Sequence, residues 1–245
     1  ILVTQRNYPN TIQLGDVSKW REWDLPKIDL VIGGSPCQGF SFAGKQLNFE
    51  DPRSKLFFEF VDIVNELKPI YFLLENVRMK QEFQDIISEY LGIEPININS
   101  SLVSAQLRNR FYWTNLPNVT QPGDKGINLQ DILESGYSDR KKSLCILEGY
   151  SRPNSTIERL WHRYKNKSFA QIVFFGKDLD PNNIRVLSQI EMEKLQTVPV
   201  GYTQPLNRNQ AASLLGNGWT VDVIAHIFQG LKEGEPNDKQ RLPTS

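Results

Sequence analysis

Several residue types are scarce in this chain of 245 residues, and each absence excludes a class of protein. Only two cysteines, Cys37 and Cys145, and two histidines are present, which supports neither a disulfide framework nor a zinc site. The apolar runs, such as 70–74, are far shorter than the roughly 18 residues that suggest a membrane span. We therefore expect a soluble protein in a reducing, cytoplasmic setting.

An excess of charge of one sign is also missing. The 28 Lys and Arg residues equal the 28 Asp and Glu residues in number, which excludes a simple polycation that coats nucleic acid. The segment 138–177 nevertheless holds nine basic and three acidic residues. Trp161, His162 and Tyr164 alternate with these basic residues, a pattern that suits phosphate contact and groove packing. A solvated surface is the more common explanation of a basic stretch taken alone.

Apolar patterns alternate along the first half of the chain. Residues 28–34 and 70–75 resemble strands buried on both faces, and 54–67 has apolar residues at helical spacing before Pro69. Strand, helix, strand is a parallel crossover unit. The pattern continues with a predicted helix near 81–91 and predicted strands near 96–99 and 110–114. This order predicts an α/β sheet.

The second half of the chain is less regular. Loop residues interrupt short apolar pieces from 117 to 183, which predicts an inserted lobe. Ser188 and Glu191 fit a capping box that starts a helix through about Gln196, and the last helix is predicted over 219–231. We expect an α/β domain over 1–116, the lobe over 117–183, completing helices over 184–231 and a polar tail over 232–245.

Cys37 is the sharpest candidate for chemistry. It lies in a glycine- and proline-rich turn directly after the first predicted strand, and ligands of open α/β sheets bind just outside such strand ends. A lone cysteine can equally be a small buried hydrophobe. Glu75 ends the second strand at the same edge. A thiol and a carboxylate on adjacent strand ends favour covalent catalysis with acid assistance.

Three long polar side chains follow further along the chain. Strand alternation predicts that Gln106, Arg108 and Arg110 share one face. Such a face is usually solvated. Near a pocket, however, two guanidinium groups could hold a carbonyl oxygen or a phosphate and help to keep a thiolate ionised.

Six motifs, in this order, resemble those of DNA (cytosine-5) methyltransferases. They are Gly15-Asp16-Val17, Pro36-Cys37-Gln38, Asp51-x-Arg53-x-x-Leu56-Phe57, Glu75-Asn76-Val77, Gln106-x-Arg108-x-Arg110 and Gly216-Asn217. Some details are similar to the de novo branch and others to bacterial and phage modification enzymes. The resemblance implies a Rossmann-like methyltransferase sheet that uses S-adenosylmethionine, with 117–183 as a small inserted target-recognition lobe.

The resemblance also implies catalytic roles in methylation of C5 of a cytosine flipped out of duplex DNA. Cys37 would attack C6 of the ring, and Glu75 would protonate N3 and bind the exocyclic amine. Arg110 would hold the O2 carbonyl. Arg108 and Gln106 would support the site and the backbone of the catalytic loop. The stretch 38–51 suits a loop that closes over the flipped base.

Cofactor and DNA contacts are implied in the same way. Asp16 would accept from the adenine amine of S-adenosylmethionine. The other implied cofactor residues are Val17, Pro36, Leu56, Asn217, Gly218 and Trp219. The implied DNA-binding residues are Gln38, Ser41, Gln106, Arg152, Arg159, Arg163 and Lys165. No metal ligand is implied.

One departure concerns the first part of the cofactor site. The family's glycine-rich methionine loop and ribose-binding acid would precede Asp16, but only fifteen residues do. We expect either an N-terminal truncation of roughly 30 to 40 residues, about one βα or βαβ unit, or a second chain that supplies this part.

The leading hypothesis is a methyltransferase of a bacterial or phage modification system, in the cytoplasm with the nucleoid, with a cognate restriction endonuclease as a partner. The alternatives are a catalytically silent DNA-binding or regulatory relative and an inactive fragment of a split methyltransferase. A thiol hydrolase that pairs Cys37 with His162 or His226 lacks any suggestion of a triad.

Overall fold

The computed structural model describes residues 1–35, 52–151, 156–167 and 171–232. The chain forms two compact units. We call residues 12–98, 109–120 and 227–245 the sheet unit, and residues 1–11, 99–108 and 121–226 the helix–hairpin unit. No helix in the described ranges is long and apolar enough to cross a bilayer. The functional division of the chain at 116, 183 and 231 stays a prediction.

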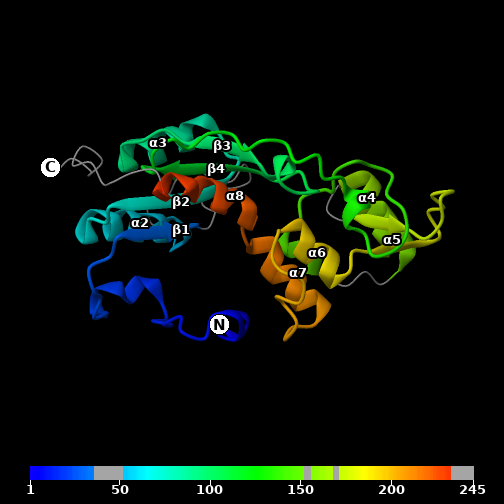
Figure 1. Ribbon diagram of the computed structural model, residues 1–245, viewed down its shortest axis with the longest axis horizontal. Helices are drawn as coiled ribbons and strands as arrows, with labels where there is room; N and C mark the ends of the chain where they lie inside the picture. Colours follow the sequence, from blue (N-terminus) through cyan, green and yellow to red (C-terminus); the bar gives the residue numbers. More distant parts are fainter. Residues whose placement is uncertain (36–51, 152–155, 168–170, 233–245) are drawn as a thin grey trace. The chain divides into compact units, whose positions relative to one another are not determined.

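The sheet unit carries the predicted α/β alternation (Figure 1). Its elements are η1 (Val17–Glu22), β1 (Leu30–Gly33), α2 (Pro52–Leu67), β2 (Tyr71–Val77), α3 (Gln81–Leu91), β3 (Ile96–Asn99), β4 (Asn109–Thr114) and η6 (Phe228–Lys232). The four strands lie in the order β1-β2-β4-β3. β1 and β2 are parallel, so the predicted crossover is confirmed. β4 runs antiparallel to β2, a direction that no local pattern in the sequence predicted.

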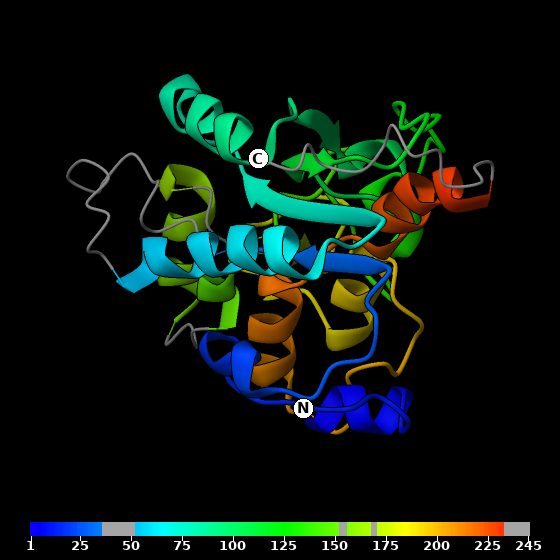
Figure 2. The same cartoon turned by 90° about the vertical axis from the view of Figure 1, so that its left-hand side faces the viewer.

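Packing of apolar side chains explains this unit. β2 is buried along almost its whole length because it lies between two neighbouring strands. Phe57, Phe60 and Val64 of α2 belong to one apolar cluster with Phe83 and Ile87 of α3. Figure 2 shows α2 running alongside β1 and β2. α3 ends at Gly92, whose positive φ of 67° gives the left-handed conformation that stops a helix.

The helix–hairpin unit is built from short elements around its own apolar core. They are α1 (Leu2–Asn7), η3 (Ser100–Leu102), α4 (Leu129–Ile132), η4 (Glu148–Ser151), α5 (Ile157–His162), the π-helical η5 (Arg163–Lys167), β5 (Ile172–Phe174), β6 (Ile184–Val186), α6 (Gln189–Leu195), α7 (Arg208–Asn217) and α8 (Val221–Ile227). β5 and β6 form an antiparallel hairpin.

Capping boxes begin two of the helices in this unit. α6 starts at Ser188 with the reciprocal Ser188–Glu191 bonds that the sequence predicted. α7 begins with the same reciprocal bonds at Asn207 and Gln210. This helix was not predicted from the sequence. The last helix also differs from its predicted start at 219, because α8 begins at Val221 and a 3₁₀ turn, η6, continues from Phe228.

Candidate active site

Glu75 and Arg110 form an ion pair at the end of β2. Arg110 lies opposite Val77 in the β2–β4 register, two residues beyond Glu75. Residues two apart on a strand share a face, so both side chains lie on the same face of the sheet. Arg110 Nε is 2.9 Å from Glu75 Oε1, and Glu75 is only 8% exposed. The structure thus brings together two of the predicted catalytic residues, one acid and one fixed cation.

Asn76 joins β2 to the residues that lead toward Cys37. Its Nδ2 donates to Ser35 Oγ at 3.1 Å and to Ser35 O at 3.4 Å, while its Oδ1 accepts from the Val77 amide at 2.8 Å. Ser35 stands two residues before Cys37 in sequence. Asn76 therefore fixes the start of the predicted nucleophile turn beside the Glu75 end of the neighbouring strand. Asn76 lies in the Glu75-Asn76-Val77 motif, but the sequence alone indicated no role for it.

Pro36, Cys37, Gln38 and Ser41 lie outside the described residues, and so does the predicted closing loop 38–51. Their roles stay predictions.

A cavity of about 180 Å³ lies at the end of β1. It is lined by Val17, Val31, Ile32, Gly33, Gly34, Ser35, Leu56, Phe60 and Ile63. The walls are mainly apolar, and two predicted cofactor residues, Val17 and Leu56, lie on them. Gly33 is required here, because a Cβ at this position would lie 2.7 Å from the Phe60 ring. The cavity suits a flat, apolar group such as a purine ring.

Asp16 precedes η1 at the same side of the sheet unit. Its Oδ1 accepts from the Ser18 amide at 3.0 Å and from Ser18 Oγ at 2.9 Å. These bonds lower the pKa of the exposed Asp16 carboxyl below its ordinary value. Since both bonds use Oδ1, Oδ2 is available to accept from a ligand amine, as the resemblance implied.

Arg108 holds the turn between α7 and α8 within the helix–hairpin unit. Its Nη2 donates to Gly218 O at 2.7 Å and to Gly216 O at 3.2 Å, and its Nη1 donates to Ile146 O at 3.0 Å. The side chain is buried. Arg108 therefore fixes the backbone around Asn217, one of the predicted cofactor residues. The predicted approach of Asn217, Gly218 and Trp219 to the cofactor stays a prediction.

Gln106 is completely buried in the same unit. Its Nε2 donates to Leu195 O at 2.7 Å and to Gln196 Oε1 at 2.9 Å. Gln196 in turn donates to Leu215 O and accepts from Thr220 Oγ1 at 2.9 Å. This network supports the turn that Arg108 holds. Gln196 and Thr220 were not identified from the sequence, because their partners are distant along the chain.

The predicted single strand face for Gln106, Arg108 and Arg110 is wrong. β4 begins only at Asn109, so alternation does not extend back to the two earlier residues. Hydrogen bonds within the helix–hairpin unit determine where the side chains of Gln106 and Arg108 point. Arg110 instead pairs with Glu75 in the sheet unit.

The predicted DNA-binding residues that the structure describes lie on α5 and η5. Arg159 and Lys165 are exposed, and Lys165 Nζ lies 5.0 Å from the centroid of the Trp161 ring. Arg163 is half-buried, and its Nη2 donates to Gly149 O at 3.1 Å. Arg152 lies outside the described residues. The exposed cations suit contact with phosphate groups.

Two residues of the basic segment point inward, contrary to a uniform DNA-facing surface. Tyr164 is 2% exposed and belongs to the apolar core, so the expectation that it packs in a groove is wrong. Lys142 Nζ donates to three backbone carbonyls, those of Ser101 at 2.6 Å, Ser104 at 3.1 Å and Ile127 at 2.6 Å. Its charge stabilises the fold.

Comparison with protein families gives a match over most of the chain. The model of C-5 cytosine-specific DNA methylases matches residues 3–88 and 78–233. The type II methyltransferase M.NgoBV of Neisseria gonorrhoeae is 48% identical over 156 residues, which are 55% of this chain and 37% of that protein. The orphan methyltransferase M.SPRI of Bacillus phage SPR is 47% identical over 247 residues, 92% of this chain and 55% of that protein. The chain thus spans only part of these relatives.

Solved structures share the fold. The Entamoeba histolytica methyltransferase EhMeth matches 95% of this chain and 86% of its own, with a TM-score of 0.68 and 16% identity. The S. pombe Dnmt2 methyltransferase matches 94% of this chain and 87% of its own, with a TM-score of 0.67 and 16% identity.

Proposed function

Because the chain belongs to the family of C-5 cytosine-specific DNA methylases, we propose that the protein transfers a methyl group from S-adenosylmethionine to C5 of cytosine in duplex DNA. Curated relatives are type II and orphan phage methyltransferases, which supports a role in a bacterial or phage modification system.

The observation that carries this proposal is the arrangement at the end of β2. Glu75 and Arg110 are paired at 2.9 Å, and the adjacent Asn76 bonds to Ser35, two residues before Cys37. An acid and a fixed cation that can hydrogen-bond to a pyrimidine ring thereby lie together at one sheet edge, and the proposed nucleophile Cys37 follows Ser35 by two residues in sequence.

These groups divide the reaction into feasible steps. A cytosine must first leave the duplex, at a cost of a few kcal/mol. The Cys37 thiolate then forms a bond to C6 while Glu75 delivers a proton to N3, and the ring becomes an enamine that is nucleophilic at C5. Arg110 donates to O2 and holds the ring. After C5 has been methylated, a base removes the C5 proton, the C6–Sγ bond breaks and releases the thiolate, and the N3 proton returns to Glu75, which restores the neutral aromatic ring.

S-adenosylmethionine supplies the electrophilic methyl group. The cavity at the end of β1 fits its adenine part, because the walls at Val17 and Leu56 are apolar and Gly33 leaves room beside Phe60. Asp16 Oδ2 would accept from the adenine amine. This chain therefore contains side chains suited to the adenine end of the methyl donor.

Duplex DNA is the proposed partner of the segment 138–177, through Arg159 and Lys165 on α5 and η5. A cognate restriction endonuclease is a further proposed partner. An extract of the host should then cleave unmethylated DNA but not DNA that this protein has methylated.

Transfer of labelled methyl from S-adenosylmethionine to DNA tests the proposal. We expect the full-length protein to label DNA at cytosine C5 and the Cys37→Ala variant to lose the activity. Undiminished transfer by the variant would refute the role of Cys37. Cys37→Ser is the conservative control, and since a hydroxyl ionises far less readily than a thiol, its activity should also be very low. Bisulfite sequencing of the product identifies the methylated positions.

A further inference from the structure

η1 is too short to hold its own position. It is a single 3₁₀ helix of six residues, and 3₁₀ helices have poor hydrogen-bond geometry. Yet it follows directly on Asp16 and begins with Val17, which lines the cavity at the end of β1. The placement of both residues must therefore come from contacts of η1 with another element.

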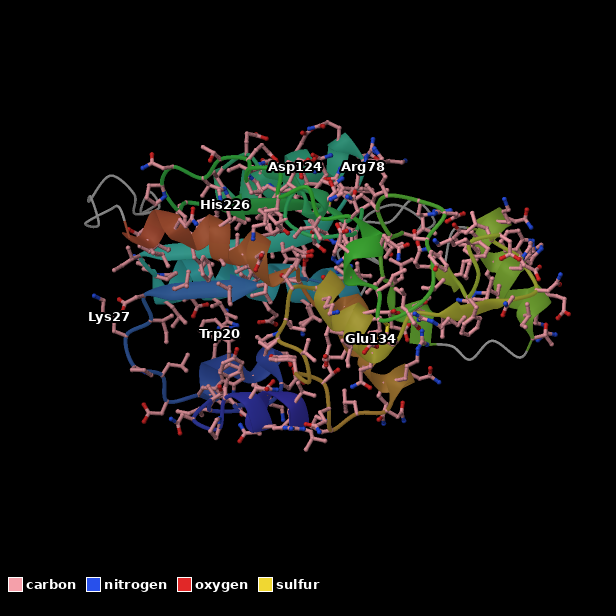
Figure 3. All side chains as sticks on the ribbon, turned by 45° about the vertical axis from the view of Figure 1, so that its right-hand side comes forward. Trp20, Lys27, Arg78, Asp124, Glu134 and His226 are labelled. Atoms are coloured by element: carbon pink, nitrogen blue, oxygen red, sulfur yellow. The ribbon has the colours of Figure 1, made fainter. Side chains whose placement is uncertain are left out.

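Two adjacent side chains of η1 supply these contacts, and both reach α2. Trp20 points away from η1 (Figure 3) and is 4% exposed, and its Nε1 donates to Glu59 Oε2 at 3.2 Å. Arg21 contacts three carboxylates of α2: Glu59 at 3.6 Å, Asp62 at 3.0 Å and Glu66. The Arg21 guanidinium also lies over the Trp20 ring, 4.5 Å from its centroid. We call Trp20, Arg21 and these three carboxylates the η1 clamp.

The partner face of α2 leads to the same cavity. Glu59 lies three residues after Leu56, so the two are neighbours on the helix surface. Leu56 lines the same cavity as Val17. The η1 clamp thus joins the two elements that contribute Val17 and Leu56. Most of its ion pairs are half-exposed, and such pairs contribute little to overall stability. Their effect is local, on the distance and angle between η1 and α2.

We propose that Trp20 and Arg21 are positioning residues for the adenine end of the methyl donor, through their contacts with Glu59, Asp62 and Glu66 of α2. The inference rests on the proposed function. Neither residue needs to touch the cofactor. They hold Asp16 and Val17 against the Leu56 wall, so that the Asp16 carboxylate meets an amine on a ring that lies in the cavity.

Two ligands that differ at one position test the proposal with the full-length protein. S-adenosyl-L-homocysteine carries the amine that Asp16 would accept, whereas S-inosyl-L-homocysteine has a carbonyl oxygen in its place. Isothermal titration calorimetry gives the dissociation constant of each. We expect the wild-type protein to prefer the adenosyl ligand, and Arg21→Met to reduce this preference about tenfold by weakening the adenosyl ligand more than the inosyl ligand. Trp20→Phe should act in the same direction, and Arg21→Lys should lie between wild type and Arg21→Met.

Lys27→Met is the matched control, because Lys27 is exposed (Figure 3) and has only a 3.9 Å pair with the exposed Asp29. It should leave both dissociation constants unchanged. In steady-state assays Arg21→Met should raise KM for S-adenosylmethionine while KM for DNA and kcat at saturating cofactor stay within twofold.

Equal weakening of both ligands by Arg21→Met, or an unchanged preference, would overturn the positioning role. Failure of the wild-type protein to bind or to discriminate between the two ligands would instead overturn the cofactor assignment in the proposed function, and this inference with it.

Discussion

Glu75 is buried and forms an ion pair with Arg110, and a single substitution at this position tests its proposed role. Replacement by glutamine keeps the size and one acceptor but removes the proton that N3 requires. Positioned general acids contribute about 100-fold or more, so Glu75→Gln should lower kcat by at least that factor in the methyl-transfer assay. The dissociation constant of S-adenosylhomocysteine should not change.

Glu82→Gln serves as the control for this prediction. Glu82 lies on α3, and its side chain is largely exposed with only a 3.4 Å contact to Lys80. Its replacement should leave kcat unchanged. If Glu75→Gln retained full kcat, Glu75 would not be the proton donor.

On helix α6, Glu191 is a fully buried carboxylate with hydrogen bonds to both of its oxygens. Glu191 accepts from the amides of Glu134 at 2.9 Å and Ser188 at 2.8 Å, and from both Nη atoms of Arg185 at 2.7 and 2.8 Å. Burial alone would raise the pKa of Glu191, but the hydrogen bonds from Arg185 and the two amides outweigh it and lower the pKa below its ordinary value of 4.5.

This shift predicts the pH dependence of stability. A carboxylate whose pKa is lowered on folding stabilises the native state above its unfolded pKa, and this contribution is lost as the pH falls below about 4.5 toward the folded pKa. Glu191→Gln should therefore cost about 3 kcal/mol at pH 7 and flatten the decline of the free energy of unfolding below pH 4.5. Urea unfolding across this range measures both effects. Glu22→Gln, at an exposed position of η1, should reproduce the wild-type curve.

The elements that the sequence predicted well are those with strong local signals. The β1–α2–β2 crossover follows from apolar runs and helical spacing, and α6 follows from its capping box. α7 has a capping box too, but it buries mainly small residues, Ala211, Ala212 and Gly216. A Cβ on Gly216 would lie 2.4 Å from the backbone carbon of Leu147. Close backbone packing of this kind leaves no strong apolar periodicity in the sequence.

The residues of the candidate site could likewise be predicted only where a local pattern marks them. Glu75 and Arg110 could be proposed from their positions at strand ends and from the motif order. The antiparallel direction of β4, which pairs these residues, depends on a contact between distant segments. The same holds for Trp20 and Glu59, which are 39 positions apart. Such contacts carry no local pattern, so sequence reasoning could not find them.

At the scale of the whole molecule, the net charge is zero although the segment 138–177 is basic. Not every lysine of this segment has an ammonium group that is exposed for contact with a phosphate. Lys165 is exposed, whereas the Lys142 ammonium is bonded to three carbonyls. Each phosphate contact adds about −0.9 to the slope of log K against log salt concentration. Lys165→Met should therefore make the slope less steep by about 1, and Lys142→Met should leave it unchanged. Fluorescence anisotropy at several salt concentrations measures the slopes, and equal slopes for the two variants would contradict this assignment.

The bonds from Asn76 to Ser35 have a consequence for how the length of this chain could vary. They join the adjacent strands β1 and β2, so the register of these strands, in which Gly33 lies opposite Leu74, sets the position of Ser35 relative to Glu75 and Asn76. A slip of one residue would move one strand by about 3.3 Å and turn its side chains to the other face. Insertions and deletions within these two strands should consequently abolish methyl transfer, because they would move Ser35 away from Glu75 and Asn76.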